Sequence, residues 1–445
     1  MKLRVLIVCL AAATALCGAT VSSSVTFNKD IQPILEKNCQ GCHRPGEVAP
    51  MSFLTYQETR PWAKAIREAV LSKRMPPWFA DPHHGKFSND RSLEPGDIEK
   101  LTAWAERGAP EGKPAGRSQS KPFVEGWNIG TPDAVFEMPI EFQVPPSGTI
   151  DYQYVVIPTG LTEDKWIQMA EVRPGNRALV HHVIAFVREP GAKWLSEAKP
   201  GEPFVPRRRS SQGGEQRREG GEPQRREEVR EGEFVVGFAP GTVPEILAPG
   251  QGKLIKAGSD LVFQMHYTAN GKAGVDRTKI GLIFAKQPPA QRIFTIAAMN
   301  RKFVIPAGAA NYQVDAQMTL HGEVTLTALL PHMHLRGKDF EYRVVYPTGE
   351  SQVLLRVPKY SFNWQLSYYL EKPLLLPKGT RIECTAHFDN SPNNADNPDP
   401  NSDVRWGDQS WEEMMIGFMD VAFDAKTNPE DLLREKKPAP ARTGE

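Results

Sequence analysis

The amino-acid sequence predicts a multidomain chain in which a small all-α domain precedes two antiparallel β-sandwich domains. The chain has 445 residues, which is too long for one ordinary domain and is enough for two or three. Apolar residues recur at helical intervals only near its beginning, and short apolar runs separated by turn residues follow. Glycine (36) and proline (39) are abundant, which favours many turns and short strands over long helices.

The composition is that of a globular protein without a strong charge bias. Hydrophobic residues make up 40% of the chain and charged residues 24%, which excludes wholesale disorder. Lysine and arginine (54) balance aspartate and glutamate (53), for a net charge of +1. This balance gives no reason to expect nucleic acid or an anionic membrane as a partner.

Residues 1–19 have the pattern of a secretory signal peptide. Lys2 and Arg4 supply the positive start, Val5–Leu16 is apolar, and Cys17-Gly18-Ala19 offers small residues for cleavage. The apolar run is shorter than the roughly 18–20 residues that a membrane span needs. No other stretch is apolar enough to cross a bilayer, so we expect a periplasmic or secreted chain without stable membrane insertion.

Residues 26–114 are expected to form the small all-α domain. Pro61 is a favourable first-turn residue for a helix, and Gly108 is a suitable C-terminal cap. The polar residues 115–127 that follow are expected to be a linker. The apolar residues with helical spacing are Ile31, Ile34 and Leu35, then Trp62, Ile66 and Val70, and then Ile98, Leu101, Trp104 and Ala105.

The strand-like part of the chain divides near Gln287-Pro288-Pro289. We expect one β-sandwich over 128–287, a second over 290–425 and a polar tail over 426–445. The predicted strands are Tyr152–Ile157, Trp166–Val172, Leu179–Val187, Leu261–Thr268, Lys279–Ala285, Val324–Leu330, Phe340–Tyr346, Val353–Val357, Arg381–Phe388 and Met414–Phe423.

Residues 206–233 differ from both sandwiches. They contain eight arginines and seven glutamates, with Val229 as the only aliphatic residue between the prolines and Phe234. Such a segment cannot bury a core, so we expect a flexible charged insertion. A docking role for its mixed charges is the alternative to a solvated loop.

Cys39-Gln40-Gly41-Cys42-His43 is the C-x-x-C-H signature of covalent haem c attachment. Cysteines one helical turn apart can form thioether bonds to both vinyl groups, and the adjacent histidine then reaches the iron. A thiol redox pair and half of a zinc site are the alternatives, but no second C-x-x-C exists to complete a zinc site. The remaining Cys384 is expected to be a lone buried thiol.

A second iron ligand is expected from Met75 in Arg74-Met75-Pro76-Pro77-Trp78. This arrangement resembles the class I cytochrome c domain, in which a loop methionine after the haem motif completes His/Met ligation. His83 and His84 are the rival candidates, and Met51 is a weaker one.

Seven of the ten histidines follow residue 180. His332 and His334 are two apart, so on a strand they face the same way and can bind one metal ion. His181 and His182 are adjacent, so they need a bulge or a strand end to do the same. An isolated strand histidine is more often a hydrogen-bonded packing residue than a ligand.

The order of these motifs resembles the copper type II, ascorbate-dependent monooxygenases, the family of peptidylglycine hydroxylating monooxygenase and dopamine β-monooxygenase. The resemblance covers roughly Asn128–Phe423 and implies two jelly-roll-like β-sandwich domains. The motifs, in chain order, are His181-His182, Gln264-Met265-His266-Tyr267, His332-Met333-His334 and Glu412-Glu413-Met414.

The resemblance implies two copper ions with different roles. His181, His182 and His266 would hold the electron-transfer copper, and His332, His334 and Met414 the copper at which O₂ binds and a substrate C–H bond is attacked. Imidazole suits both copper oxidation states, and a thioether favours Cu(I). If Met414 lies on a strand, alternation directs Met415 and Met419 to the other face, away from the ligands.

Other positions depart from the family. Leu330, Ile416 and Phe418 stand where the amidating enzymes hold a substrate carboxylate, which argues against peptide amidation. His387 is expected either to orient a ligand or to be an ordinary hydrogen-bonded histidine, and His321 is unassigned. The Asn/Asp-rich stretch Asp389–Asp403 is expected to be a loop near the site rather than a calcium site.

Together these features predict an exported haem- and copper-containing monooxygenase that hydroxylates a small organic substrate with O₂. Its reductant would be ascorbate or a protein electron donor, that is, a redox partner that delivers electrons through the fused haem. The first alternative is a periplasmic electron-transfer or copper-binding protein without hydroxylase activity. A second is a structural interaction module that presents the cytochrome to a partner.

Overall fold

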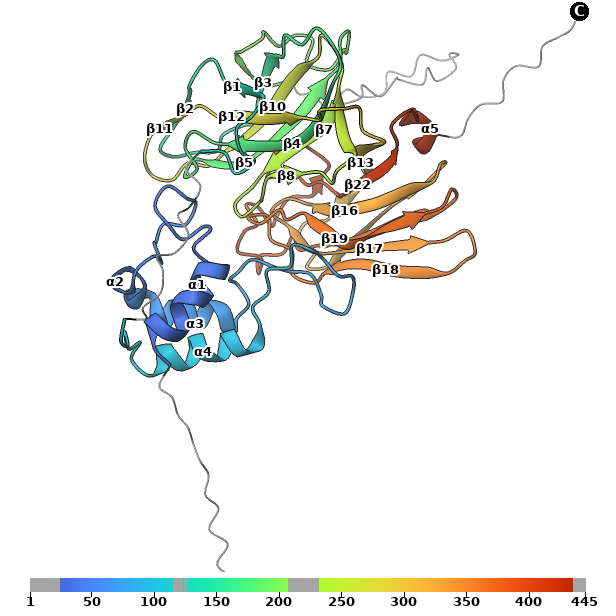
Figure 1. Ribbon diagram of the computed structural model, residues 1–445. Coiled ribbons are helices and arrows are strands. Elements are labelled where there is room, and N and C mark those ends of the chain that lie inside the picture. Colours follow the sequence, from blue (N-terminus) through green and yellow to red (C-terminus); the bar gives the residue numbers. More distant parts are fainter. Residues whose placement is uncertain (1–24, 115–122, 124–125, 207–231, 435–445) are drawn as a thin grey trace, which may run out of the picture.

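The computed structural model describes residues 25–114, 123, 126–206 and 232–434. The expected signal peptide, most of the linker and of the charged insertion, and the end of the polar tail lie outside these residues. The described chain consists mostly of β-strands in several sheets with few helices (Figure 1), as the sequence predicts, and this is consistent with β-sandwich domains. No helix in the described ranges is long and apolar enough to cross a membrane.

Most of the helical residues precede the strands and form a helical unit over 25–114. Leu101 and Trp104 of α4 are completely buried against Ile31 and Leu35 at the beginning of the unit, which gives it a core of its own. The helices are a π-helical turn Phe27–Ile31, α1 Gln32–Asn38, α2 Tyr56–Thr59, a 3₁₀ turn Arg60–Trp62, α3 Ala63–Leu71, α4 Pro95–Glu106 and, near the other end of the chain, α5 Glu430–Leu433.

The strands of the first half of the β part are β1 Ala134–Glu137, β2 Phe142–Val144, β3 Gln153–Pro158, β4 Lys165–Arg173, β5 Val180–Arg188, β6 Pro203–Phe204, β7 Glu233–Phe238, β8 Glu245–Ile246, β9 Gln251–Ile255, β10 Asp260–Tyr267, β11 Gly274–Asp276 and β12 Lys279–Phe284. Those of the second half are β13 Gln291–Met299, β14 Val304–Ile305, β15 Tyr312–Thr319, β16 Val324–His332, β17 Gly337–Val345, β18 Ser351–Val357, β19 Tyr368–Leu376, β20 Arg381–Phe388, β21 Val404–Arg405 and β22 Ile416–Asp424.

Each half contributes to two layers that share a buried core. In the first half, the five-stranded sheet β6-β3-β10-β5-β7 packs with β1-β12-β4-β9 around residues such as Val183 and Leu282. In the second half, the four-stranded sheet β15-β20-β17-β18 packs with β13-β22-β16-β19 around Phe340 and Leu326. Cys384 is a free thiol buried in this second core, as expected.

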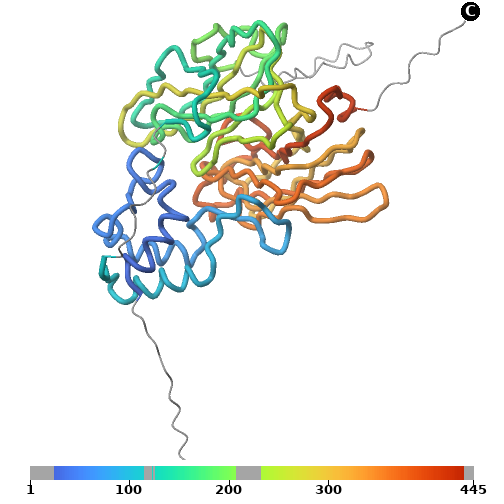
Figure 2. The backbone as a smooth tube through the Cα atoms, viewed as in Figure 1, coloured from blue at the N-terminus to red at the C-terminus, as the bar shows by residue number. Residues whose placement is uncertain are grey.

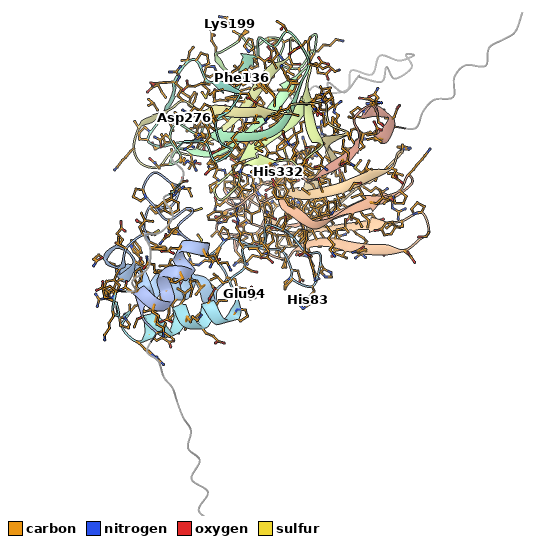
Figure 3. All side chains as sticks on the ribbon, viewed as in Figure 1. His83, Glu94, Phe136, Lys199, Asp276 and His332 are labelled. Atoms are coloured by element: carbon orange, nitrogen blue, oxygen red, sulfur yellow. The ribbon has the colours of Figure 1, made fainter. Side chains whose placement is uncertain are left out.

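The two halves are continuous through one sheet, which the sequence did not predict. β9 and β13 pair in parallel at Gln291–Gln251 and Arg292–Gly252, so nine strands, including β8 paired to β4, belong to the same sheet. Backbone hydrogen bonds therefore fix the orientation of one half relative to the other. His332 lies where the two halves meet (Figure 3).

Residues 78–91, which we call the strap, leave the helical unit and pack on the second half (Figure 2). Phe87 forms a bridge with Leu370 of β19 and is buried in the second core. Asn89 bonds on both sides, donating to the Ser367 carbonyl at 2.8 Å and accepting from the Tyr369 N–H at 3.1 Å. The expected domain over 26–114 thus includes a segment that belongs structurally to the β part.

We expect Phe87→Ala to destabilise the strap and the core beneath it. The Phe87 side chain is 9% exposed and stacks edge-on against Trp78 and Tyr368. Removing a buried phenyl ring costs about 3 kcal/mol or more of unfolding free energy. Denaturant unfolding checks the value, with Ser88→Ala as the exposed control on the same strap. An unfolding free energy equal to that of the control would contradict the packing.

Candidate metal centres

The first histidine group lies on neighbouring strands of the five-stranded sheet. His181 and His182 begin β5, and His266 is near the end of β10. His266 is paired with His182, whereas Tyr267 is paired with Val180, so His181 is an extra, bulged residue. The bulge turns two adjacent imidazoles toward the third. The bulge or strand end that adjacent histidines need in order to bind one metal ion is therefore present.

The three imidazoles are spaced as ligands of one metal ion would be. The Nδ1 atom of His182 lies 3.2 Å from Nδ1 of His181 and 3.4 Å from Nδ1 of His266. Two nitrogens bound to one cation at about 2.0 Å in tetrahedral geometry are about 3.3 Å apart. The residues present therefore fit a metal ion held by three histidines.

His182 and His266 are buried, His181 is half-buried, and all three rings are uncharged near neutral pH. Burial lowers the pKa of His181, and it lowers the pKa values of His182 and His266 far below the usual range. The neighbouring imidazoles add to the effect, because a second positive charge would be repelled. Neutral rings keep the lone pairs that metal binding requires.

Tyr152 packs against this group and was not identified from the sequence. Its ring centroid lies 4.6 Å from that of His266 and 5.4 Å from that of His182, edge-on to both. Its hydroxyl is buried and has no hydrogen-bond partner among the described residues. Burial raises the pKa of Tyr152 well above its usual value, so the hydroxyl stays protonated.

The second histidine group lies at the end of β16. His332 is the last residue of the strand, His334 lies just beyond it, and their ring centroids are 5.2 Å apart. His332 Nδ1 lies 2.8 Å from Gln365 Oε1, and His334 Nδ1 lies 3.0 Å from the Glu412 carbonyl. Because carbonyl oxygens only accept, Nδ1 carries the proton in both rings and each lone pair is on Nε2.

The free ring nitrogen of His334 fits a metal ligand. His334 Nε2 is buried and has no partner among the described residues. Burial lowers the pKa of His332 to about 4 and that of His334 to about 3, so both rings are neutral at pH 7. A buried, unpaired lone pair is costly unless a ligand satisfies it.

Glu413 fastens the segment that carries Met414 to the His334 loop. Its two side-chain oxygens accept from the backbone N–H groups of His334 at 2.8 Å and Arg336 at 2.6 Å. Burial raises the Glu413 pKa to about 8, against the opposing effect of these bonds and of Arg336. Gly337 completes the loop, because a Cβ there would lie 2.7 Å from the Met333 Cβ.

Met414 is next to this anchor, outside any strand. β22 begins at Ile416, so the expectation that strand alternation separates Met414 from its neighbours does not apply. Met414 is half-buried, whereas Met415 and Met419 are completely buried in the second core. The different environments, rather than alternation, distinguish Met414 from the two core methionines.

Two side chains of the β18–β19 connection lie between the histidine groups. Gln365 accepts from His332 through Oε1, and its Nε2 lies 3.5 Å from His182 Nδ1. The Phe362 ring stacks on His181 at 4.9 Å and lies 5.7 Å from the His334 ring. The two groups are therefore linked by side chains that no sequence motif identified.

A cavity of about 100 Å³ lies beside these groups. His182 and His332 form part of its wall, and so do Leu330 and Phe418, two of the three positions at which the sequence is expected to depart from the amidating enzymes. The third such position, Ile416, is buried. The strap contributes the remaining side of the cavity, so all three parts of the chain line it.

The C-x-x-C-H motif forms one helical turn after α1. The Cys42 and His43 N–H groups donate to the Cys39 carbonyl at 3.1 and 2.9 Å, which brings the three side chains onto one turn. Both thiols are free, and burial raises the pKa of Cys39 to about 12 and also raises that of Cys42. Redox-active thiol pairs have lowered pKa values, so these thiols fit covalent attachment of haem better than disulfide exchange.

The haem motif lies against the first half of the β part. Arg177, which precedes β5, bonds Glu47 at 2.6 Å, and Glu47 also pairs with Arg44 at 3.0 Å. Arg177 and Arg91 both act on the pKa of Cys42, opposing the effect of burial. The turn that would carry haem is thus close to the strand that carries His181 and His182.

The candidate distal ligands are in different places. Met75 lies four residues after the end of α3, and its backbone nitrogen is 3.3 Å from the Ala69 carbonyl oxygen of that helix. His83 and His84 lie on the strap, and the His83 side chain is 84% exposed and paired with Asp81. Figure 3 shows His83 at the outer edge of the molecule. The backbone of Met51 acts on the pKa of His43, so Met51 is next to the proximal ligand.

The remaining histidines and the Asn/Asp-rich loop have structural partners. His387 Nδ1 lies 2.7 Å from Asp339 Oδ1, which fits an ordinary hydrogen-bonded histidine. The N–H of His321 donates to the Leu432 carbonyl. Asn390 binds Arg336 Nε through its side-chain oxygen at 2.8 Å, so the loop supports the His334 turn.

Comparisons with known proteins identify no family. No protein-family model matches the chain, and no curated protein matches it. Solved structures that overlap it include "Structure of infectious bursal disease virus Gx strain", at 9% identity over 71% of this chain and 78% of the other, with a TM-score of 0.19. Another is the virus-derived T=1 particle, at 10% identity over 67% and 72%, with a TM-score of 0.18. Overlaps this weak carry no argument about function.

Proposed function

We propose that the chain is an exported copper-dependent monooxygenase fused to a class I cytochrome c domain, similar to the copper type II, ascorbate-dependent enzymes. It would hydroxylate a C–H bond of a small organic substrate with O₂ and two electrons. Its two jelly-roll-like sandwiches would be residues 128–287 and 290–425, and its place of action the periplasm or the outside of the cell.

One observation carries the proposal. Two groups of buried, neutral imidazoles lie on either side of Gln365, which contacts both. A single structural histidine is common. Here five come together from three strand ends, and no imidazole among them is paired with a carboxylate of the described residues, which supports metal binding.

The first group would hold one copper ion through His181, His182 and His266. Its three Nδ1 atoms already have the spacing of a common ligand set. The second group would hold the other through Nε2 of His332 and His334, with the Met414 thioether as the third ligand. Glu413 supports this assignment, because its bonds to the His334 loop keep the neighbouring Met414 segment beside that loop.

Copper held in this way supplies one-electron chemistry and the activation of O₂. The protein's own part is positional. Gln365 and the Glu412 carbonyl fix which nitrogen of His332 and His334 carries the proton. Phe362 fills the space between the two groups with an apolar ring, which excludes water from it.

Haem c, attached through Cys39 and Cys42 with His43 and Met75 as iron ligands, would supply a one-electron carrier. The Glu47–Arg177 ion pair supports a relay toward the first histidine group, because it holds the attachment turn beside the strand of His181. The high exposure of His83 favours Met75 as the distal ligand.

Copper titration into the metal-free protein tests the proposal. We expect two copper ions per chain, with His266→Ala and His332→Ala each losing one and the double variant losing both, because each variant removes a ligand from a different group. Metal analysis and electron paramagnetic resonance measure the loss, with His387→Ala as the control. A full copper content in both single variants would contradict the two-centre assignment.

Oxygen uptake by the reduced, copper-loaded protein separates the enzyme from the alternatives. A hydroxylase forms hydroxylated product in proportion to the oxygen consumed, whereas an electron carrier oxidises its metals and forms none. Iron without copper in the isolated protein would instead favour a module that presents the cytochrome.

A further inference from the structure

We propose that Arg91, on the strap, binds an anionic group of the substrate, so that the substrate is a small carboxylate with an apolar body. The inference rests on the proposed function, because it takes the cavity beside His332 as the substrate site. It adds to that function a binding residue supplied by the helical unit rather than by either sandwich.

Arg91 is fixed on the cavity wall by both of its neighbouring structures. Arg91 lines the cavity together with Asn89. The two hydrogen bonds of Asn89, to Ser367 just before β19 and to Tyr369 within it, hold the strap in register. From the other side, Arg91 Nη1 donates to the Gly241 carbonyl in the β7–β8 connection. The guanidinium is thus fixed by one hydrogen bond on a strap that is itself held in place, and its other N–H groups are available to a ligand.

The charge of Arg91 is uncompensated. Arg91 forms no ion pair with any described residue, although burial lowers its pKa. Arginine nevertheless remains charged in proteins. Its one assigned partner, the Gly241 carbonyl, is neutral. A half-buried cation without a carboxylate partner is the feature that an anion would satisfy.

The other charged group of the wall already has a partner. Glu245 lines the same cavity, but its Oε1 lies 3.7 Å from Nζ of the buried Lys253. Lys253 also donates to the Val235 carbonyl at 2.8 Å. Arg91 is the only lysine or arginine among the described residues of the wall, so an anion in the cavity would be drawn to it.

The rest of the wall defines the body of the ligand. Leu330 and Phe418 are apolar, and they take the places from which a carboxylate anchor is missing. A cavity of about 100 Å³ admits a short aliphatic chain, since a cavity of roughly 150 Å³ holds benzene. The positive end and the apolar walls together select a short-chain carboxylate.

A haem propionate is the competing anion, because Arg91 and Cys42 influence each other's pKa. The thioether bonds of haem c form at the vinyl edge of the macrocycle, and the propionates lie at the opposite edge. A haem attached at Cys42 would therefore present its thioether edge, not its propionates, toward a guanidinium that acts on Cys42, so the cavity remains the source of the anion.

Fluorine NMR with 4,4,4-trifluorobutyrate and the matching neutral amide tests the inference on the full chain, both metal-free and copper-loaded. We expect the wild type to bind the carboxylate about tenfold or more tightly than the amide, as one charged hydrogen bond allows. Arg91→Gln should remove this preference, and Lys86→Gln, which removes a charge elsewhere on the strap, should keep it.

The design separates substrate recognition from a merely structural tie to Gly241. If Arg91 only anchored the strap, Arg91→Gln would weaken both probes equally or neither. Arg91→Lys keeps the positive charge and should retain part of the preference for the carboxylate. An equal effect of Arg91→Gln on both probes, or no binding of the carboxylate to the wild type, overturns the inference. A carboxylate preference that depends on Arg91 in a protein without hydroxylase activity would uphold the inference and refute the proposed function.

Discussion

Met414→Ile is expected to abolish oxygen-dependent hydroxylation while leaving copper at His181, His182 and His266. Isoleucine has nearly the volume of methionine but no thioether, so the variant removes a ligand without opening a cavity. A thioether favours Cu(I), the state that must meet O₂. Product formation should fall at least about a hundredfold, because even changes around a metal site cost 10–100-fold.

Met415→Ile is the matched control for this prediction. Met415 is the next residue and is completely buried among the side chains of the second core, so it is the packing counterpart of Met414. Its replacement should cost less than about 1.5 kcal/mol of stability and leave turnover intact. Copper content and hydroxylated product are measured for both variants. Undiminished hydroxylation in Met414→Ile would refute the ligand assignment, and equal losses in both would attribute the effect to packing.

The first histidine group shows how far strand geometry can be read from a sequence. Adjacent His181 and His182 can bind the same metal ion only at a bulge or a strand end. The pairing of β5 with β10 has a bulge at this point. That condition is local, because the period of a strand is two residues. The pairing of β5 with β10, which brings in His266, is a long-range event that only the family resemblance suggested.

The side chains around the histidines were beyond sequence reasoning. Gln365 and Phe362 belong to no motif, and Glu413 is part of the Glu412-Glu413-Met414 motif but had no role assigned to it. Each acts through a contact made across a long stretch of chain. Glutamine in a polar loop and phenylalanine near a strand have many ordinary roles. Their function here follows from position alone, since the loop before β19 folds back between the two histidine groups.

Contacts between distant parts of the chain also determine the domain boundaries, so the sequence could predict these boundaries only in part. Helical periodicity located the helices of residues 26–114, yet nothing in the composition of the strap predicts pairing with β19. Trp78 and Phe87 could equally have completed a helical core. The β9–β13 pairing is likewise only two residue pairs long, too short to leave a pattern in the sequence.

The strap and the Glu47–Arg177 ion pair would make the helical unit part of the proposed catalytic architecture. The strap contributes Trp78, Asn89 and Arg91 to the cavity, and the Glu47–Arg177 pair holds the C-x-x-C-H turn beside β5. A tethered electron carrier needs only proximity, whereas this unit is bonded to both halves. The attachment turn would therefore keep one orientation during electron delivery.

Cys39→Ser together with Cys42→Ser is expected to abolish turnover driven by a protein electron donor and to leave turnover with ascorbate intact. Serine cannot form the thioether bonds, so the carrier is lost, while the five histidines and Met414 are untouched. A small reductant reaches copper without the carrier. The measurement is product formation with each donor, together with the copper content, which must stay at the wild-type value.

Arg177→Gln distinguishes a relay through the interface from mere storage of electrons on haem. The variant keeps the haem motif but removes the 2.6 Å ion pair to Glu47, so donor-driven turnover should fall while haem absorption and ascorbate-driven turnover remain.

For the double replacement of Cys39 and Cys42, Cys384→Ala is the control, because it removes a thiol from the second core and leaves the haem motif intact. Equal rates with both donors after the double serine replacement would rule out the relay, because electrons would then reach copper without haem.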